Sequence, residues 1–322
     1  MYYIGVDLGG TNIAIGIVDE NFKIVLKGST PTCPNREGEL IIKDMALLAE
    51  RLLKEAGIPL SEVAYVGIAS PGSVDPEQGT IEYANNLPFS HFPIVKYFQK
   101  YLAVPKIYIE NDANAAALGE ALAGVAKGTR NSIMITLGTG VGGGIIIDGK
   151  VYSGFNHAAG ELGHIVIHRN GRSCSCGRKG CWEAYSSATA LTALTKERIA
   201  ACKEKGISSL MVKEFDAGAR ISARTAFAAM KQGDAEAKAV VDEYIAHLAC
   251  GISNMINTFQ PEVLSIGGGV SGEKDNLLKP LLAIIDGEQH LCDNDKKTKI
   301  LIAELGNDAG IIGAACLGKQ GN

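Results

Sequence analysis

Apolar residues at the start of the chain form two short runs separated by glycines. Residues 2–7 read Y-Y-I-G-V-D and residues 13–18 read I-A-I-G-I-V, with G-G-T between them at 9–11. Short runs rich in isoleucine and valine and bounded by glycine are typical of buried strands. The pattern therefore predicts a strand, a tight glycine turn and a second strand, with a third strand over residues 22–27.

The same pattern returns more than a hundred residues later. Residues 132–137 are an apolar run, G-T-G stands at 138–140, and a second run covers 142–147 before D-G at 148–149 and K-V-Y at 150–152. Two strand–turn–strand units at such a separation favour a duplicated domain over a repeat array with a short period.

Helical and strand-like segments alternate along the rest of the chain. Helices are expected at 39–56, 93–102, 114–123, 188–205, 235–259 and 309–317, and strands at 63–70, 106–109, 262–266 and 299–305. This alternation is typical of an α/β fold. We expect two α/β lobes, one formed by residues 1–115 together with a final helix at about 306–322, and a larger one formed by residues 116–305.

Charge and hydropathy exclude several classes of partner. The chain has 322 residues and a net charge of -4, which argues against nucleic acid, because binding to phosphate backbones depends on clustered Lys and Arg. No apolar run reaches the roughly 18 residues of a membrane span, and the first residues lack the basic and apolar regions of a secretion signal. We expect a cytoplasmic protein without a membrane partner.

Three cysteines lie close together in C-S-C-G-R-K-G-C-W-E at 174–183, and the segment G-E-L-G-H ends shortly before them at 164. Three thiolates and one imidazole form a donor set that suits tetrahedral Zn²⁺, and the two glycines allow the tight turns that bring the sulfurs together. The alternative is a surface loop with three reduced cysteines, which leaves their clustering unexplained. The sequence predicts a zinc site at His164, Cys174, Cys176 and Cys181.

The glycine turns present backbone N–H groups at close range, as a nucleotide phosphate chain requires. Asp7 ends the first strand and supplies a carboxylate suited to hydrated Mg²⁺. The alternative is an ordinary hairpin turn, because a short glycine motif alone is a weak signal. A third glycine turn at 267–269 favours the nucleotide site over this alternative. The expected nucleotide-binding positions are Asp7, Gly9, Gly10, Thr11, Asn12, Gly138, Thr139, Gly140, Gly268 and Gly269.

The order of these motifs carries a family resemblance. D-L-G-G-T, L-G-T-G-V-G-G-G, S-I-G-G-G-V and G-N-D-A-G resemble the nucleotide-binding motifs of the actin-like ATPase superfamily. E-N-D-A-N-A-A-A-L-G-E, G-E-L-G-H and the cysteine segment narrow the resemblance to the sugar kinases of the ROK family, from residue 4 to about 318. The resemblance implies a two-lobed, ribonuclease H-like fold with nucleotide and sugar in the interdomain cleft, Mg²⁺ with ATP, structural Zn²⁺, and a homodimer or homotetramer.

The segment E-N-D at 110–112 comes after a strand and opens a helix, so its side chains can project toward a ligand. A hydroxyl that attacks a phosphoryl group needs a carboxylate to orient it and accept its proton. The residues alone leave Asp112 open between this role and capping the helix. The family resemblance implies that Asp112 is the general base.

The same resemblance identifies the residues that would bind the hydroxyl groups of the sugar. Asn111, Glu161 and Glu183 offer hydrogen-bonding groups to hydroxyls, and His164, if one nitrogen binds zinc, presents an N–H on the other. Loops with S-P-G-S and N-N-L-P match family loops that close over the sugar. They add Gly72 and Asn86, for which a simple turn role is an equal alternative, whereas Asn12 stands where many relatives carry lysine.

The predicted function is ATP-dependent phosphorylation of the 6-hydroxyl of a hexose, with glucose favoured. Other substrates are fructose, mannose, N-acetylglucosamine and N-acetylmannosamine, which motifs cannot separate because discrimination lies in loop geometry. A sugar-responsive repressor of the same family is disfavoured, since the first strand begins within four residues of the N-terminus with no DNA-binding segment before it. A catalytically silent sugar-binding protein is disfavoured by the retention of Asp112.

Overall fold

The computed structural model describes residues 1–288 and 296–320. Contact clustering divides the chain into two compact units. Unit 1 contains Met1–Met134, Gly143–Gly160 and Ala303–Asn322, and unit 2 contains Ile135–Gly142 and Glu161–Ile302. The expected boundary at residues 115 and 116 falls inside helix α3 (Asp112–Ala123), and the expected division into lobes stays a prediction.

Two five-stranded sheets have the same strand order, which is the structural form of the repeat in the sequence. The first is β3-β2-β1-β4-β8 and the second is β11-β10-β9-β12-β13. Their strands are β1 (Tyr2–Leu8), β2 (Asn12–Val18), β3 (Ile24–Pro31), β4 (Val63–Ser70), β8 (Ile107–Asn111), β9 (Ser132–Leu137), β10 (Val141–Ile147), β11 (Lys150–Val151), β12 (Val263–Gly267) and β13 (Lys299–Ile302). Numbered within its own sheet, each order reads 3-2-1-4-5, so the duplication expected from the two glycine-turn motifs is confirmed.

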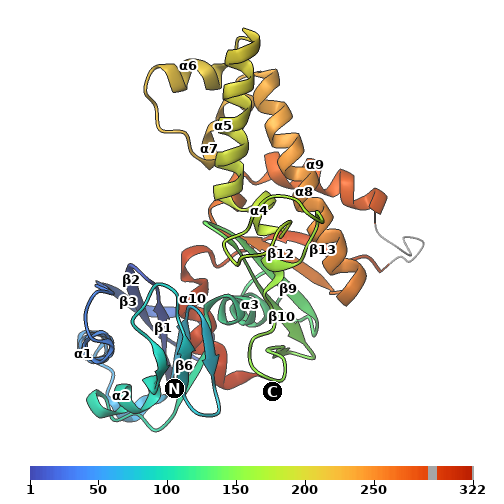
Figure 1. The fold of residues 1–322 in the computed structure, drawn as a ribbon. Coiled ribbons are helices and arrows are strands. Elements are labelled where there is room, and N and C mark those ends of the chain that lie inside the picture. The colour runs from blue at the N-terminus through green and yellow to red at the C-terminus, as the bar shows by residue number, and fades with distance from the viewer. Residues whose placement is uncertain (289–295, 321–322) are drawn as a thin grey trace. The chain divides into compact units, whose positions relative to one another are not determined.

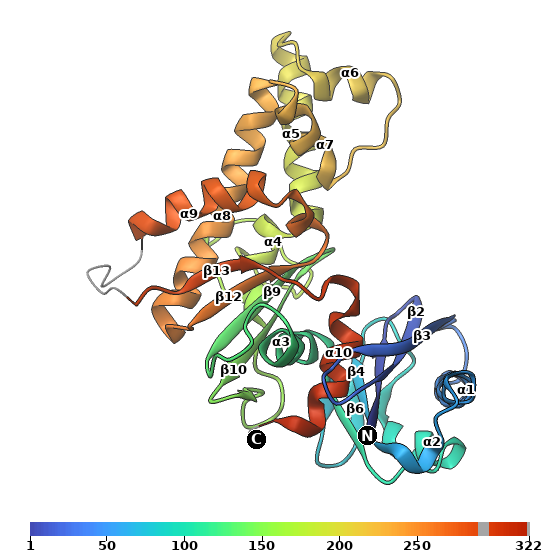
Figure 2. The ribbon, with the colours of Figure 1, turned by 180° about the vertical axis from the view of Figure 1, so that it is seen from behind.

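Side chains of β1 alternate between the two faces of the first sheet, as a strand requires. Ile4, Val6 and Leu8 belong to the core on which α1 (Gly38–Ala56) packs, while Gly5 faces α10 (Ala309–Cys316). Figure 1 shows α1 and α10 on opposite faces of this sheet, and Figure 2 shows the same arrangement from behind.

Helix α10 lies unusually close to the sheet because glycines face it. A Cβ on Gly5 would lie 2.0 Å from the carbonyl oxygen of Ile311, and one on Gly67 would lie 1.8 Å from that of Ala314. Helix α10 also packs on α3, where a Cβ on Gly313 would lie 1.9 Å from the carbonyl oxygen of Ala115. This close approach brings the start of α10 against the end of β1, where the first candidate carboxylate stands.

The helices and strands predicted from periodicity are present within a few residues of their expected ends. The last strand is shorter than expected, because the Leu305 N–H donates to the Glu120 carboxylate (2.8 Å) and not to a neighbouring strand. The remaining elements were not predicted. They are β5 (Ser73–Asp75), β6 (Thr80–Tyr83), β7 (Ser90–Phe92), α4 (Glu183–Ser186), α6 (Leu210–Asp216), α7 (Ala223–Lys231) and α9 (Asp275–Glu288).

Short strands give little periodic signal, and Pro280 lies inside α9, where proline normally argues against a helix. Helix α2 (Ile94–Tyr101) completes unit 1. In unit 2, α7 packs with α5 (Ala188–Lys205) and α8 (Ala235–Phe259) (Figure 1). Within the described residues, none of the helices combines the length and apolarity needed to cross a bilayer.

Candidate active site and metal centre

The first glycine turn joins β1 to β2 and is held by groups outside it. The Gly9 N–H donates to the Asn12 carbonyl (3.0 Å), which closes the turn. Thr32 donates its hydroxyl to the Gly9 carbonyl (2.7 Å) and its N–H to the Thr11 carbonyl (3.0 Å). A Cβ on Gly10 would lie 3.4 Å from the Cβ of Asn86, so the turn also meets one of the expected sugar loops.

Two candidate carboxylates in unit 1 lie close enough for the charge of one to act on the other. Asp7 lies on the α10 face of β1, where a Cβ on Gly310 would lie 2.4 Å from its Oδ2. Burial, and next the charge of Asp112, raise the pKa of Asp7 from 3.8 to about 6. A second carboxylate close to a poorly solvated one repels it, and a divalent cation with oxygen ligands would relieve that repulsion.

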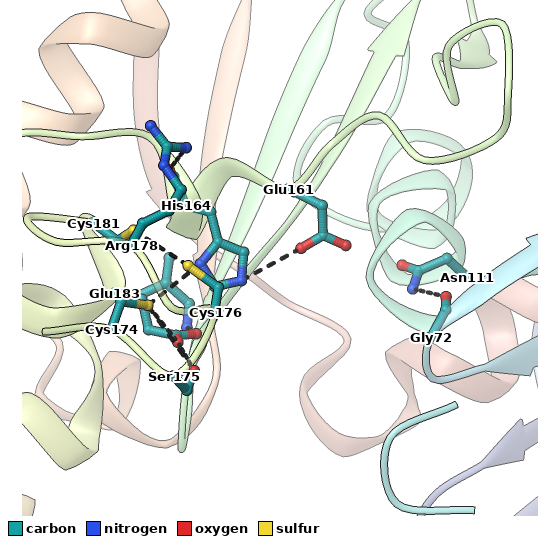
Figure 3. A network of polar contacts seen from close by, with 11 residues as sticks. Gly72, Asn111, Glu161, His164, Cys174, Ser175, Cys176, Arg178, Cys181 and Glu183 are labelled. Atoms are coloured by element: carbon teal, nitrogen blue, oxygen red, sulfur yellow. Dashed lines mark hydrogen bonds and ion pairs between the residues drawn. The ribbon is translucent and has the colours of Figure 1, made fainter. Parts of the chain in front are cut away.

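The segment at residues 110–114 is held in one conformation by its own side chains. Asn111 caps α3, since its Oδ1 accepts from the N–H groups of Ala113 (2.9 Å) and Asn114 (3.2 Å). Its Nδ2 donates to the Gly72 carbonyl (3.0 Å; Figure 3). Glu110, missed in the sequence, is buried and accepts from the Asn111 N–H (2.9 Å) and the Asn114 amide (3.0 Å).

This arrangement separates the roles of Asn111 and Asp112. The amide of Asn111 uses its oxygen on the helix and one N–H on Gly72, and an amide nitrogen carries two N–H groups. Asp112 is exposed in the first turn of α3. Its Oδ1 also lies 2.8 Å from the Ala113 N–H, but the capping position belongs to Asn111. Capping is therefore not the reason for an aspartate at 112.

Unit 2 brings the four expected metal ligands together. One ligand atom from each of His164, Cys174, Cys176 and Cys181 lies within 4.8 Å of every other. The Cys176 and Cys181 sulfurs are 3.6 Å apart, as are the Cys174 sulfur and the His164 Nδ1. Tetrahedral Zn²⁺ with bonds of about 2.3 Å to sulfur and 2.0 Å to nitrogen requires separations of about 3.5 to 3.8 Å. The donor set and its spacing fit zinc.

The cysteine loop is a small hairpin. Isolated bridges join Val166 to Cys181 and Ser173 to Lys179, and the Cys174 N–H donates to the Arg178 carbonyl (2.9 Å). Gly180 has φ +81° and a Cβ there would lie 1.7 Å from the His168 carbonyl oxygen, so only glycine fits. The expected role of glycine in this loop is confirmed by its backbone.

The imidazole of His164 has two different sides (Figure 3). Its Nδ1 faces the Cys174 sulfur, while its Nε2 lies 3.9 Å from a carboxylate oxygen of Glu161. Arg178 donates to the His164 carbonyl (3.0 Å) and fixes the backbone at this residue. One nitrogen thus points into the metal site and the other toward an exposed carboxylate.

Glu183 links the cysteine loop to the second glycine turn. One oxygen accepts from the Val141 N–H (3.0 Å), and the other lies 3.3 Å from the Ser175 hydroxyl. A Cβ on Gly140 would lie 2.3 Å from Glu183 Oε2, so the turn packs directly on the carboxylate. Glu183 thus contacts a residue expected to bind nucleotide, a link that the sequence did not reveal.

The other side of the second turn is held by the start of α5. The Ala188 N–H donates to the Gly138 carbonyl (2.8 Å), and the Thr189 hydroxyl donates to the Thr139 carbonyl (2.8 Å). The third glycine turn also belongs here, because Gly268, at φ +83°, would place a Cβ 2.6 Å from the backbone of Leu137. Gly269 begins the short 3-10 helix Gly269–Glu273.

Trp182 packs between the cysteine loop and helix α8. It is fully buried, donates from its indole nitrogen to the His247 carbonyl (3.1 Å) and lies against Gly251 of α8. The ring therefore packs against the cysteine loop and is not exposed for stacking on a sugar.

Comparisons with known proteins agree with this geometry. The family model described as the ROK family matches residues 3–321. The chain belongs to the ROK family. It is 37% identical over 322 residues to a glucokinase of Halalkalibacterium halodurans, covering 99% of this chain and 95% of that protein. It is 36% identical over 320 residues to a glucokinase of Thermotoga maritima, covering 98% and 97%.

A solved structure shows the same fold for this ROK protein. It is a ROK family glucokinase from Streptomyces griseus in complex with glucose and AMPPNP, with a TM-score of 0.78 and 34% identity over 98% of this chain and 99% of that one. The two-lobed α/β fold of the actin-like ATPases, expected from the motifs, is therefore confirmed, and the chain is a sugar kinase of the glucokinase-like group.

Proposed function

We propose that this chain is an ATP-dependent glucokinase that transfers a phosphoryl group to the 6-hydroxyl of glucose. The observation that carries the proposal is the exposed carboxylate of Asp112 in the first turn of α3, where Asn111 already supplies the helix cap. Glucokinase relatives that match nearly the whole chain support the choice of glucose.

Asp112 is the proposed general base. Its carboxylate would orient the 6-hydroxyl and accept its proton as the bond to phosphorus forms. Asp7 is the proposed carboxylate on the Mg²⁺ side, where the cation, when bound with ATP, neutralises charge on the transferred phosphoryl group. The charge of Asp112 raises the pKa of Asp7, which supports placing the two side chains at one reaction centre.

Four polar side chains are proposed to bind hexose hydroxyls. Asn111 would donate the amide N–H that Gly72 does not use, and Glu161 and Glu183 would accept hydrogen bonds. His164 would donate from Nε2, since its Nδ1 faces the sulfurs. Hydrogen-bonding groups of this kind reject substrates that lack the matching hydroxyl, because the protein groups would be left unpaired.

Two loop residues are proposed to complete the hexose site. Gly72 has φ +87° and would place a Cβ 2.0 Å from the Tyr83 carbonyl oxygen, so the loop between β4 and β5 keeps its shape only with glycine. Asn86 lies beside Gly10.

The metal held by His164 and the three cysteines is proposed to be Zn²⁺. Four protein ligands leave no open position, so the ion supplies structure and fixes the neutral tautomer of His164. The contact of Cys174 with the His164 Nδ1 leaves Nε2 as the donor. The hydrogen bond from Ser175 holds the Glu183 carboxylate against the cysteine loop.

The backbone of the glycine turns is proposed to bind the phosphates of ATP. In the first turn these positions are Gly9, Gly10, Thr11 and Asn12, and in unit 2 they are Gly138, Thr139, Gly140, Gly268 and Gly269. Turns with free backbone N–H groups form concave sites for anions.

A coupled kinase assay over glucose, mannose, fructose, N-acetylglucosamine and N-acetylmannosamine tests the proposal. We expect glucose to give the highest kcat/KM. Turnover of an acetylated sugar alone would remove the glucose assignment, and absence of ATP turnover with every sugar would remove the kinase.

The Asp112→Asn variant tests the role of the base. We expect kcat to fall about 100-fold or more, the usual scale for loss of a general base, with little change in glucose affinity or melting temperature. A near-normal kcat would show that Asp112 is not the base.

A further inference from the structure

The two glycine turns are anchored in the same way, although the anchoring residues lie in different parts of the chain. Each turn has two carbonyl groups held from outside, one by a backbone N–H and one by a threonine hydroxyl. In the first turn, Thr32 supplies both donors, to the carbonyls of Gly9 and Thr11. In the second turn, Ala188 supplies the N–H to Gly138 and Thr189 supplies the hydroxyl to Thr139.

The hydroxyl bonds are of similar length but differ in their surroundings. The distance is 2.7 Å from Thr32 Oγ1 to the Gly9 oxygen and 2.8 Å from Thr189 Oγ1 to the Thr139 oxygen. Thr32 is fully buried, whereas Thr189 is exposed. A requirement to satisfy a buried hydroxyl could account for the first contact but not for the second.

A held carbonyl fixes the direction of the N–H in the same peptide unit. The described peptide bonds are trans, and in a trans peptide the C=O and the N–H of the next residue point in opposite directions. The Thr32 hydroxyl therefore turns the Gly10 N–H away from the anchor, and the Thr189 hydroxyl does the same to the Gly140 N–H. Within residues 1–288 and 296–320, neither N–H has a hydrogen-bond acceptor.

We propose that Thr32 and Thr189 are positioning residues that aim the backbone N–H groups of Gly10 and Gly140 at the phosphates of the bound nucleotide. This inference rests on the proposed function, which places nucleotide phosphates at both turns. Neither threonine needs to touch the nucleotide. Each acts through the peptide whose carbonyl it holds.

The test compares valine and serine at each position. Thr32→Val and Thr189→Val keep the shape of the side chain and every backbone N–H, so each variant loses one hydroxyl hydrogen bond. Thr32→Ser and Thr189→Ser keep that bond. Thr192→Val is the matched control, because Thr192 donates to the Ala188 carbonyl (2.8 Å) on the same helix and does not touch the turn.

The readouts are the Kd of AMPPNP and of adenosine by calorimetry, and the KM for ATP and for glucose by the coupled assay. We expect each valine variant to weaken AMPPNP binding and raise the KM for ATP by about five- to tenfold, the scale of one net hydrogen bond. Adenosine affinity and the KM for glucose should stay within about twofold of wild type. Serine variants and Thr192→Val should match wild type in all four.

Unchanged AMPPNP affinity in Thr189→Val would overturn the proposal for the second turn, and the same result in Thr32→Val would overturn it for the first. An equal loss for adenosine would also overturn it, because adenosine has no phosphates. If Thr32→Val does not fold, Thr189→Val still decides, because it removes the equivalent hydroxyl hydrogen bond at an exposed residue. If the wild type binds AMPPNP but phosphorylates no sugar, the proposed function fails while the binding data still test the anchors.

Discussion

Replacing Asp7 with asparagine should make the protein more stable and less active. In the folded chain the pKa of Asp7 is raised from 3.8 to about 6, chiefly by burial and further by Asp112. One pKa unit corresponds to about 1.4 kcal/mol, so the ionised carboxylate costs the folded state about 3 kcal/mol at neutral pH. Some solvent contact remains at this side chain and screens the charge, and about 2 kcal/mol is the expected gain.

The sign of the pH dependence is set by the direction of the shift. A raised pKa means that the folded state holds the proton more tightly than the unfolded chain, so the cost is complete above pH 6 and disappears below about pH 4. An asparagine side chain at this position carries no charge at any pH. The advantage of Asp7→Asn should therefore be full at pH 8, decline through pH 6, and be absent at pH 4.

Thermal unfolding of the protein without nucleotide or Mg²⁺ measures this difference. For a unit of this size, 2 kcal/mol raises Tm by about 4 to 8 °C. The variant should also lose the stabilisation that Mg²⁺ and ATP give to the wild type, together with most of kcat. Asp242→Asn is the control, because Asp242 is an exposed residue paired with Lys238 on α8.

Two results would refute this reasoning. The first is an Asp7→Asn variant that melts at or below the wild-type temperature at pH 8. The second is an advantage that persists unchanged at pH 4, which would mean that the effect does not come from ionisation of the carboxylate.

Two further predictions concern the metal site and Gly310, the glycine that lies against the Asp7 carboxylate. Cys176→Ser should lower zinc, measured by elemental analysis, from near one per chain to a small fraction, whereas Cys33→Ser should retain it; zinc-free wild type would exclude the metal site. Gly310→Ala would place a methyl group 2.4 Å from Asp7 Oδ2, so kcat should fall at least about tenfold with glucose affinity unchanged. Gly287→Ala, where no atom of the described residues lies within 4 Å of the added methyl group, should be neutral, and equal loss in both variants would contradict the steric argument.

Much of the fold could be predicted because it depends on local patterns. Residues 2–7 and 13–18 alternate or cluster apolar side chains over strand lengths, and the helix over 235–259 was expected with the ends it has. The close approach of α10 to the sheet could not be predicted. It depends on Gly5 and Gly67 meeting backbone atoms of residues more than two hundred positions away.

The site residues also divide into those that the sequence could predict and those that it could not. The metal ligands were predictable because three of the four lie within eight residues and their chemistry is specific. Thr32 and Thr189 were not, since a single threonine gives no signal and its partner lies 23 or 50 residues away. Glu110 was missed because the sequence gives no sign that a carboxylate at the end of a strand is buried. Its role follows only from its two donors, the Asn111 N–H and the Asn114 amide.

The short stretch from Cys181 to Thr189 sets the distance along the chain between the metal site and the second glycine turn. It begins at a metal ligand, passes through Glu183 in the single turn of α4, and ends at the hydroxyl that holds Thr139. Each residue added to a helix rotates all later residues by about 100°, so one insertion here would move Thr189 off its carbonyl while leaving the cysteines in place. We expect any change in the length of this stretch to disrupt the second glycine turn, whereas the loops between α5, α6 and α7 should tolerate changes of length.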